Sequence, residues 1–253
     1  MNELISEFLS TLENHHTKSS YSTILQQYDS FTKEISLPLV SDFLKQYSNL
    51  SPKTIAYKIS ILRKFFTFLQ KKGMLTRNPI DDITIPSYKQ RTGRYLEEEQ
   101  IQKILQYEFP DTSIGLRNKA ILYILWYCGS KISETLDLYV KDYLKDTHQL
   151  HFSGTHERNI SIPEKCESCL QDYLIKTDLI NQANSFLFPS NNKSKHLTRE
   201  YIVSVLKKID SNLSPEVLRN SFAVYQLKSG MNIRELKEQM GKESFCTTFS
   251  TIS

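Results

Sequence analysis

The hydrophobic residues of the first 86 positions recur with the period of an α-helix. Two such series are Leu4, Phe8, Leu12 and, further along, Tyr21, Leu25, Tyr28, Phe31. A longer series follows Ser51-Pro52, a pair that is typical of a helix N-cap and first turn. Its apolar positions are Ile55, Ile59, Leu62, Phe66 and Leu69. The first part of the chain is therefore predicted to be helical.

The face opposite this apolar stripe is polar and basic. It carries Lys53, Tyr57, Ser60, Lys64, Thr67 and Lys71. Between residues 43 and 80 there are 8 basic residues and no acidic one. Such a face either contacts a phosphate backbone or is an ordinary solvated helix surface. Because solvated surfaces usually mix both signs of charge, the pattern favours nucleic-acid contacts by Lys53, Tyr57, Lys64 and Lys71.

A polar, basic stretch without periodicity, residues 87–94, separates this part from the rest. It predicts a linker between a helical domain, 1–86, and a second domain, 95–253. Further helical patterns cover 116–127, 164–177, 198–210, 214–229 and 232–241. Alternating segments at 148–153 and 158–162 flank Gly154-Thr155 and predict a hairpin. The expected fold is mainly α with one small antiparallel sheet.

Charge and composition narrow the classes of function. The net charge of +4 is uneven, because residues 1–94 carry +5 and residues 95–253 carry −1. This asymmetry indicates an anionic partner for the first part. No apolar run approaches the ~20 residues that span a bilayer, and the first residues lack a secretory pattern. We therefore expect a cytoplasmic protein without a membrane partner.

Cofactor and metal signals are weak. Cys166 and Cys169 form a single C-x-x-C without a second pair or a nearby histidine, so no zinc site is expected. The seven glycines form neither of the two common phosphate-cradling loops. We predict no metal, no cofactor and no small-molecule substrate.

Four motifs then occur in order. They are C-G-S-K-I-S-E at 128–134, F-S-G-T-H-E-R at 152–158, L-S-P-E-V-L-R-N-S-F-A at 213–223, and M-G-K-E-S at 240–244 with T-T at 247–248. They resemble the boxes T-G-L-R-[IV]-S-E, G-K-G-x-K-x-R, L-[ST]-P-H-x-L-R-H-[ST]-F-A and L-G-H-x-[SD] of the tyrosine recombinases, or phage integrases. F-L-F-P at 186–189 resembles that family's y-L-F-P turn, and the region from Tyr28 to Pro79 resembles its N-terminal domain. The resemblance covers nearly the whole chain. It implies a SAM-like core-binding domain and a catalytic-type domain that close around double-stranded DNA.

The family cuts and rejoins DNA through a tyrosine, two arginines, a lysine and two histidines, without a metal or cofactor. Of the positions that match these residues, only Arg219 keeps the family's residue type. The substituted positions are Lys131 for arginine, Ser153 for lysine, Glu216 and Lys242 for the histidines, and Thr251 for tyrosine. His156, three residues beyond Ser153, could replace the missing acid. For Arg219 two roles stay open, an ion pair with Glu216 or a retained phosphate contact.

These substitutions predict a DNA-binding member of the family that does not cleave DNA itself and acts in site-specific recombination or integration. A further partner that the resemblance allows is another recombinase protomer. Whether the chain is an enzyme stays open. One alternative is an active or partner-complemented recombinase, and another is an interaction protein that no longer binds DNA. The predicted DNA contacts also include Arg91 and Arg94 of the linker and Arg158 of the hairpin.

Overall fold

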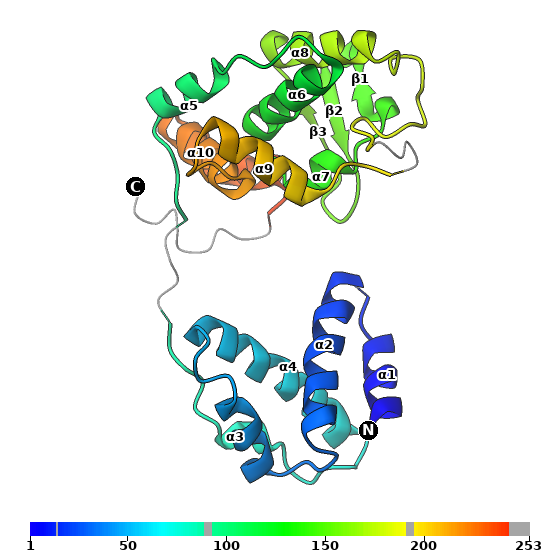
Figure 1. Ribbon diagram of the computed structural model, residues 1–253, viewed down its shortest axis with the longest axis vertical. Coiled ribbons are helices and arrows are strands. Elements are labelled where there is room, and N and C mark those ends of the chain that lie inside the picture. The colour runs from blue at the N-terminus through cyan, green and yellow to red at the C-terminus, as the bar shows by residue number, and fades with distance from the viewer. Residues whose placement is uncertain (14, 89–92, 191–194, 243–253) are drawn as a thin grey trace. The chain divides into compact units, whose positions relative to one another are not determined.

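The computed structural model describes residues 1–13, 15–88, 93–190 and 195–242. The chain forms two compact units, residues 1–91 and 92–253 (Figure 1). The division between them falls inside the stretch 87–94. Each unit has a hydrophobic core of its own.

The first unit is helical. Its elements are α1 (Asn2–Ser10), α2 (His15–Phe31), α3 (Leu37–Lys45), α4 (Pro52–Lys71) and the short 3₁₀ helix η1 (Pro79–Asp82). The aromatic rings at its centre pack edge to face or tilted, a favoured arrangement. They belong to Phe8, Tyr28, Phe43, Phe65 and Phe66.

Helix α4 begins as its sequence predicts. The hydroxyl of Ser51 accepts a hydrogen bond from the backbone N–H of Thr54 at 3.2 Å, and Pro52 occupies the first turn. The buried face is wider than the predicted stripe, because Ile61 and Phe65 are also buried. The extra width follows from the packing of α4 against α1, α2 and η1.

The second unit combines helices with one small sheet. Its helices are α5 (Glu98–Leu105), α6 (Ser113–Cys128), α7 (Ile132–Leu136), α8 (Glu164–Lys176), α9 (Arg199–Ile209), α10 (Pro215–Lys228) and α11 (Ile233–Met240), with the 3₁₀ turns η2 (Val140–Asp142) and η3 (Lys145–Thr147). The strands β1 (Tyr143–Leu144), β2 (Gln149–Phe152) and β3 (Arg158–Ser161) form an antiparallel sheet in that order. The mainly α fold with a small antiparallel sheet is thus confirmed. The sequence does not predict strand β1, since two residues are too few to show an alternating pattern.

Helix α6 is the centre of this unit and packs against α8 and α10 (Figure 1). It ends at Gly129, whose backbone is left-handed with φ +55°. A Cβ atom at this position would lie 2.2 Å from the ring of Phe222 on α10. Glycine therefore allows the chain to pass close to α10 before α7 begins. Within the described ranges, no helix is long and apolar enough to cross a membrane.

Candidate functional site

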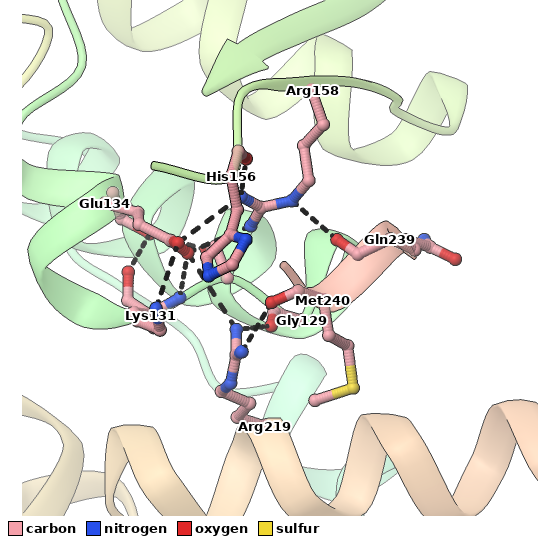
Figure 2. A network of polar contacts seen from close by, with 10 residues as sticks. Gly129, Lys131, Glu134, His156, Arg158, Arg219, Gln239 and Met240 are labelled. Atoms are coloured by element: carbon pink, nitrogen blue, oxygen red, sulfur yellow. Dashed lines mark hydrogen bonds and ion pairs between the residues drawn. The ribbon is translucent and has the colours of Figure 1, made fainter. Parts of the chain in front are cut away.

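A single carboxylate, that of Glu134 on α7, connects three segments of the second unit (Figure 2). Its Oε2 atom accepts a hydrogen bond from the backbone N–H of Lys131 at 2.8 Å. Arg158 on β3 donates from Nη2 to the same oxygen at 2.9 Å and from Nη1 to Oε1 at 3.3 Å. The ammonium of Lys131 lies 3.6 Å from Oε1. The two hydrogen bonds from the Arg158 guanidinium to the Glu134 carboxylate join the hairpin to α7.

Arg219 on α10 points into the same cluster and is only 7% exposed. Its guanidinium donates to the backbone carbonyls of Gly129 and Met240. Its Nη1 atom lies 3.9 Å from Oε2 of Glu134. The ion pair of Arg219 is therefore with Glu134 and not with Glu216, the partner in one of the two roles that the sequence left open. Glu216 is exposed in the first turn of α10, whereas the guanidinium is directed inward.

Burial and neighbouring charges shift the pKa values of Glu134, Arg219 and Lys242. Burial tends to raise the pKa of Glu134, but hydrogen bonds from Arg158 and from the Lys131 backbone outweigh burial and hold this pKa below its usual value. Burial lowers the pKa of Arg219 to about 10, against the attraction of Glu134. Burial and the nearby Arg219 also lower the pKa of Lys242. Arg219 and Glu134 are thus both charged at neutral pH.

A pocket of about 380 Å³ lies beside the cluster, between the hairpin and the end of α11. Its lining residues are His156, Glu157, Arg158, Arg234, Lys237, Glu238, Gly241 and Lys242. Gly241 has a φ of +58°, and a Cβ atom there would lie 2.8 Å from Nη1 of Arg158 and 3.0 Å from Cβ of His156. Only glycine permits this close approach of α11 to the hairpin. Among the described residues, no group of three or more His, Cys, Asp or Glu side chains could hold a metal ion.

The structure brings together some of the residues that the sequence singled out. Lys131, Arg219 and Lys242 belong to one cluster around Glu134 and the pocket. Ser153 is exposed at the end of β2, and Glu216 is exposed on α10. Thr251 lies outside the described residues.

Sequence reasoning missed the central role of Glu134. A local signal existed, because a glutamate three residues after a helix N-cap often accepts a hydrogen bond from the cap's backbone. That signal explains the contact with Lys131. The contacts with Arg158 and Arg219 come from distant segments and have no local signature.

The predicted basic face of α4 is exposed at Lys53, Tyr57, Lys64 and Lys71. Tyr57 is 46% exposed, and the Lys64 ammonium donates to the hydroxyl of Tyr21 at 3.1 Å. In the part of the chain that the structure describes, no carboxylate lies within ion-pair distance of Lys53, Lys64 or Lys71. The face therefore keeps its positive charge.

The other predicted DNA contacts differ in accessibility. Arg94 is exposed, and its backbone carbonyl accepts a hydrogen bond from the Asn220 amide at 3.2 Å. The side chain of Arg158 is only 10% exposed and bonds to Glu134 and to the carbonyls of His156 and Gln239. Its guanidinium thus holds the hairpin against α7 and α11. Arg91 lies outside the described residues.

Comparison with protein families matches residues 94–251 to the phage integrase family and residues 5–73 to the phage integrase N-terminal SAM-like domain. The tyrosine recombinase XerC of Herpetosiphon aurantiacus is 31% identical over 257 residues, covering 92% of this chain and 83% of XerC. XerC of Oceanobacillus iheyensis is 30% identical over 212 residues, covering 79% of this chain and 69% of that protein.

Two solved structures share the fold. The Tn1549 transposon integrase in complex with circular intermediate DNA has a TM-score of 0.74 at 18% identity, covering 98% of this chain and 93% of that one. The XerH site-specific recombinase bound to a palindromic difH substrate has a TM-score of 0.74 at 21% identity, covering 92% of this chain and 75% of that one.

Proposed function

The chain belongs to the phage integrase family, the tyrosine recombinases, and from this we propose that it binds double-stranded DNA in site-specific recombination or integration without cutting the DNA through its own residues. The Tn1549 integrase and XerH structures were both solved with DNA. The proposal includes two further expectations. The chain acts in the cytoplasm, and its protein partner on the DNA is an active recombinase protomer.

The exposed basic face of α4 carries the DNA-binding part of this proposal. Its 20 residues include no acidic side chain, and Lys53, Lys64 and Lys71 lie along one exposed face. Neighbouring cations are neutralised within the unit, since Lys72 pairs with Glu7 and Arg63 with Asp81. Lysines left without carboxylate partners are the ones available to neutralise DNA phosphates.

The residues of the second unit support the absence of cleavage. Strand transfer needs cations that hold the charge of the transition state and a group that protonates the leaving oxygen. Arg219 donates instead to two backbone carbonyls, and Lys131 lacks the forked donor of an arginine. Ser153 cannot act as the lysine does, and Glu216 adds a negative charge at a histidine position.

A salt-dependent binding experiment tests the DNA contact. The variant Lys53→Gln/Lys64→Gln/Lys71→Gln is compared with Lys33→Gln/Lys45→Gln/Lys72→Gln, which removes the same charge from lysines that are paired with Asp29, Asp42 and Glu7. We expect the first variant to reduce the slope of log K against log[salt] by about 2 to 3 units, and the second by less than about one. Fluorescence anisotropy of labelled duplex DNA measures both slopes. Equal slopes for the two variants would contradict DNA contacts by Lys53, Lys64 and Lys71 of α4. Absence of binding at low salt would instead favour the alternative, an interaction protein that does not bind DNA.

A nicked suicide duplex tests cleavage. After incubation with the chain and denaturing electrophoresis, we expect no covalent protein–DNA adduct, because the residues at the catalytic positions differ from those that the chemistry needs. An adduct formed by the chain alone would instead support the alternative, an active recombinase. An active relative run in parallel supplies the positive control.

A further inference from the structure

A second pocket of the second unit, of about 260 Å³, lies between the start of α6 and the end of α8. Its apolar lining consists of Leu116 and Ile175, and its charged lining of Asp111, Asp172 and Lys176. None of these residues belongs to the cluster around Glu134 or to the four sequence motifs. This α6–α8 pocket is smaller than most small-molecule sites, which occupy roughly 300 to 1,000 Å³. Its size matches a single long side chain of a partner.

The wall of the α6–α8 pocket that precedes α6 is held in place by the helix cap. The hydroxyl of Thr112 accepts a hydrogen bond from the backbone N–H of Gly115 at 3.1 Å, and the backbone N–H of Thr112 donates to the Pro110 carbonyl at 2.7 Å. A Cβ atom at Gly115 would lie 2.0 Å from that carbonyl oxygen, so the segment packs directly on the first turn of α6. Asp111 lies between these fixed residues. The pocket is therefore formed before a partner binds, which reduces the ordering cost of binding.

The apolar side chains at the α6–α8 pocket are exposed to solvent. Ile175 is 65% exposed, the highest value among the large hydrophobic side chains of the described residues. Ile114, two residues before Leu116, is 56% exposed. A single exposed isoleucine is common on protein surfaces, whereas exposed apolar side chains on both elements that form a pocket are typical of an interaction site.

The α6–α8 pocket also contains a carboxylate without a cation. Asp111 pairs with Lys176 at 3.6 Å. Asp172 has no hydrogen-bond or ion-pair partner among the residues that the structure describes. Lys119, which lines a further pocket together with Asp172, is not within ion-pair distance of it. Two carboxylates against one ammonium make the charged lining net negative, so it complements a cation and opposes a DNA phosphate.

We propose that the α6–α8 pocket is a docking site for a partner protein and receives an arginine side chain from an apolar, basic segment of that partner. The aliphatic part of the arginine packs on Leu116 and Ile175. Its guanidinium pairs with Asp172 through two parallel hydrogen bonds, a geometry that lysine cannot provide. The apolar neighbours of the arginine cover Ile114. An arginine in a central pocket is a frequent source of binding energy at protein interfaces.

The docking site is remote from the cluster around Glu134. Because an α-helix rises about 1.5 Å per residue, Leu116 near the start of α6 and Gly129 after its end are about 20 Å apart along the helix axis. A partner docked at the start of α6 thus leaves the cluster accessible. The inference goes beyond the proposed DNA binding and does not depend on it.

A library of random linear peptides displayed on phage, selected against the whole chain, tests the docking site. We expect the enriched peptides to share an arginine with apolar neighbours. By fluorescence anisotropy, a synthetic peptide of the enriched sequence should bind Ile175→Ser and Asp172→Asn about tenfold more weakly than the unchanged chain. The matched controls are Ile233→Ser on α11 and Asp146→Asn on η3, whose side chains are also exposed. They should change the affinity by less than about twofold.

Three results would overturn the docking site. The first is a selection that yields no binder, or binders that carry an acidic residue in place of the arginine. The second is a peptide that binds Ile175→Ser and Asp172→Asn as tightly as it binds the unchanged chain. The third is a dimer of the chain, detected by sedimentation equilibrium, that Ile175→Ser dissociates, because it would assign the surface to a second copy.

A competition with DNA separates this inference from the proposed function. A saturating amount of duplex should leave peptide binding unchanged, since the α6–α8 pocket is net negative. Displacement of the peptide by the duplex would overturn the docking site. Absence of duplex binding with intact peptide binding would overturn the DNA contact alone and leave the docking site supported.

Discussion

At the scale of single residues, Glu134 is the side chain on which the site depends. Arg158 and Arg219 are both largely buried, and the pKa of Arg219 is lowered by its burial and, to a smaller extent, by the nearby charge of Arg158. Their charges are offset by the same carboxylate. Removing one partner from a buried group of charges leaves the others uncompensated, which costs more than an exposed ion pair contributes.

We expect Glu134→Gln to lower the free energy of unfolding by about 3 kcal/mol. Urea unfolding, followed by the fluorescence of Trp126, measures this loss. The control is Glu238→Gln, whose side chain is 69% exposed and pairs with Arg234. It should cost about 0.5 kcal/mol or less. Similar losses for the two variants would contradict the role assigned to Glu134.

The Glu134→Gln variant also has a predictable pH dependence. Because the folded state holds the pKa of Glu134 below its unfolded value, folding favours the ionised carboxylate. Its stabilisation is complete above the unfolded glutamate pKa of about 4.3 and is lost as the pH falls through the lower folded value. The stability difference between the unchanged chain and Glu134→Gln should therefore shrink on acidification.

At the scale of elements, two glycines show how a helix end is matched to its surroundings. Gly73 follows α4 with a φ of +75°, and Gly129 follows α6 with a φ of +55°. A Cβ atom would meet nothing within 4 Å at Gly73, but would meet the Phe222 ring at 2.2 Å at Gly129. Both positions therefore need a left-handed backbone, and only the second also needs the absence of a side chain.

This contrast gives a matched test. Gly73→Ala should cost about 1 kcal/mol, the usual penalty of a left-handed alanine. Gly129→Ala should cost roughly 2 kcal/mol more, because the added methyl group must displace the ring of Phe222. Thermal or urea unfolding measures both, and equal costs would show that α6 and α10 can separate freely at this point.

At the scale of the whole molecule, each unit is stabilised by its own core. The two clusters of buried residues share no member, and Phe65 lies in the first while Trp126 lies in the second. Trp126 is the only tryptophan of the sequence, so its fluorescence reports on the second unit alone.

Phe65→Ala should destabilise the first unit by about 3 to 4 kcal/mol. We expect an earlier unfolding transition by circular dichroism and an unchanged midpoint for Trp126 fluorescence. Phe152→Ala, a matched change in the second core, should shift the fluorescence midpoint instead. A shift of the Trp126 midpoint in Phe65→Ala would show that the two units unfold as one.

Much of this architecture is readable from local sequence patterns. The helices predicted at 164–177, 214–229 and 232–241 correspond to α8, α10 and α11. α8 and α11 each bury one face, whereas the buried residues of α10 lie around most of the helix. The hairpin is also predicted from a local pattern, because apolar and polar residues alternate on both sides of Gly154-Thr155. The substitutions at Lys131, Ser153 and Glu216 are likewise evident from the residue types alone. Periodicity and substitution are properties of neighbouring residues, so the sequence by itself determines them.

Only the tertiary structure decided how those residues are connected. Arg158 bonds to the Gln239 carbonyl 81 positions away, and Arg219 to the Gly129 carbonyl 90 positions away. No local pattern encodes such pairs, because they form only when the hairpin, α7, α10 and α11 pack together. Packing gave Arg219 the partner Glu134 in place of Glu216. It also brought His156 of the hairpin and Lys237 of α11 into the lining of one pocket.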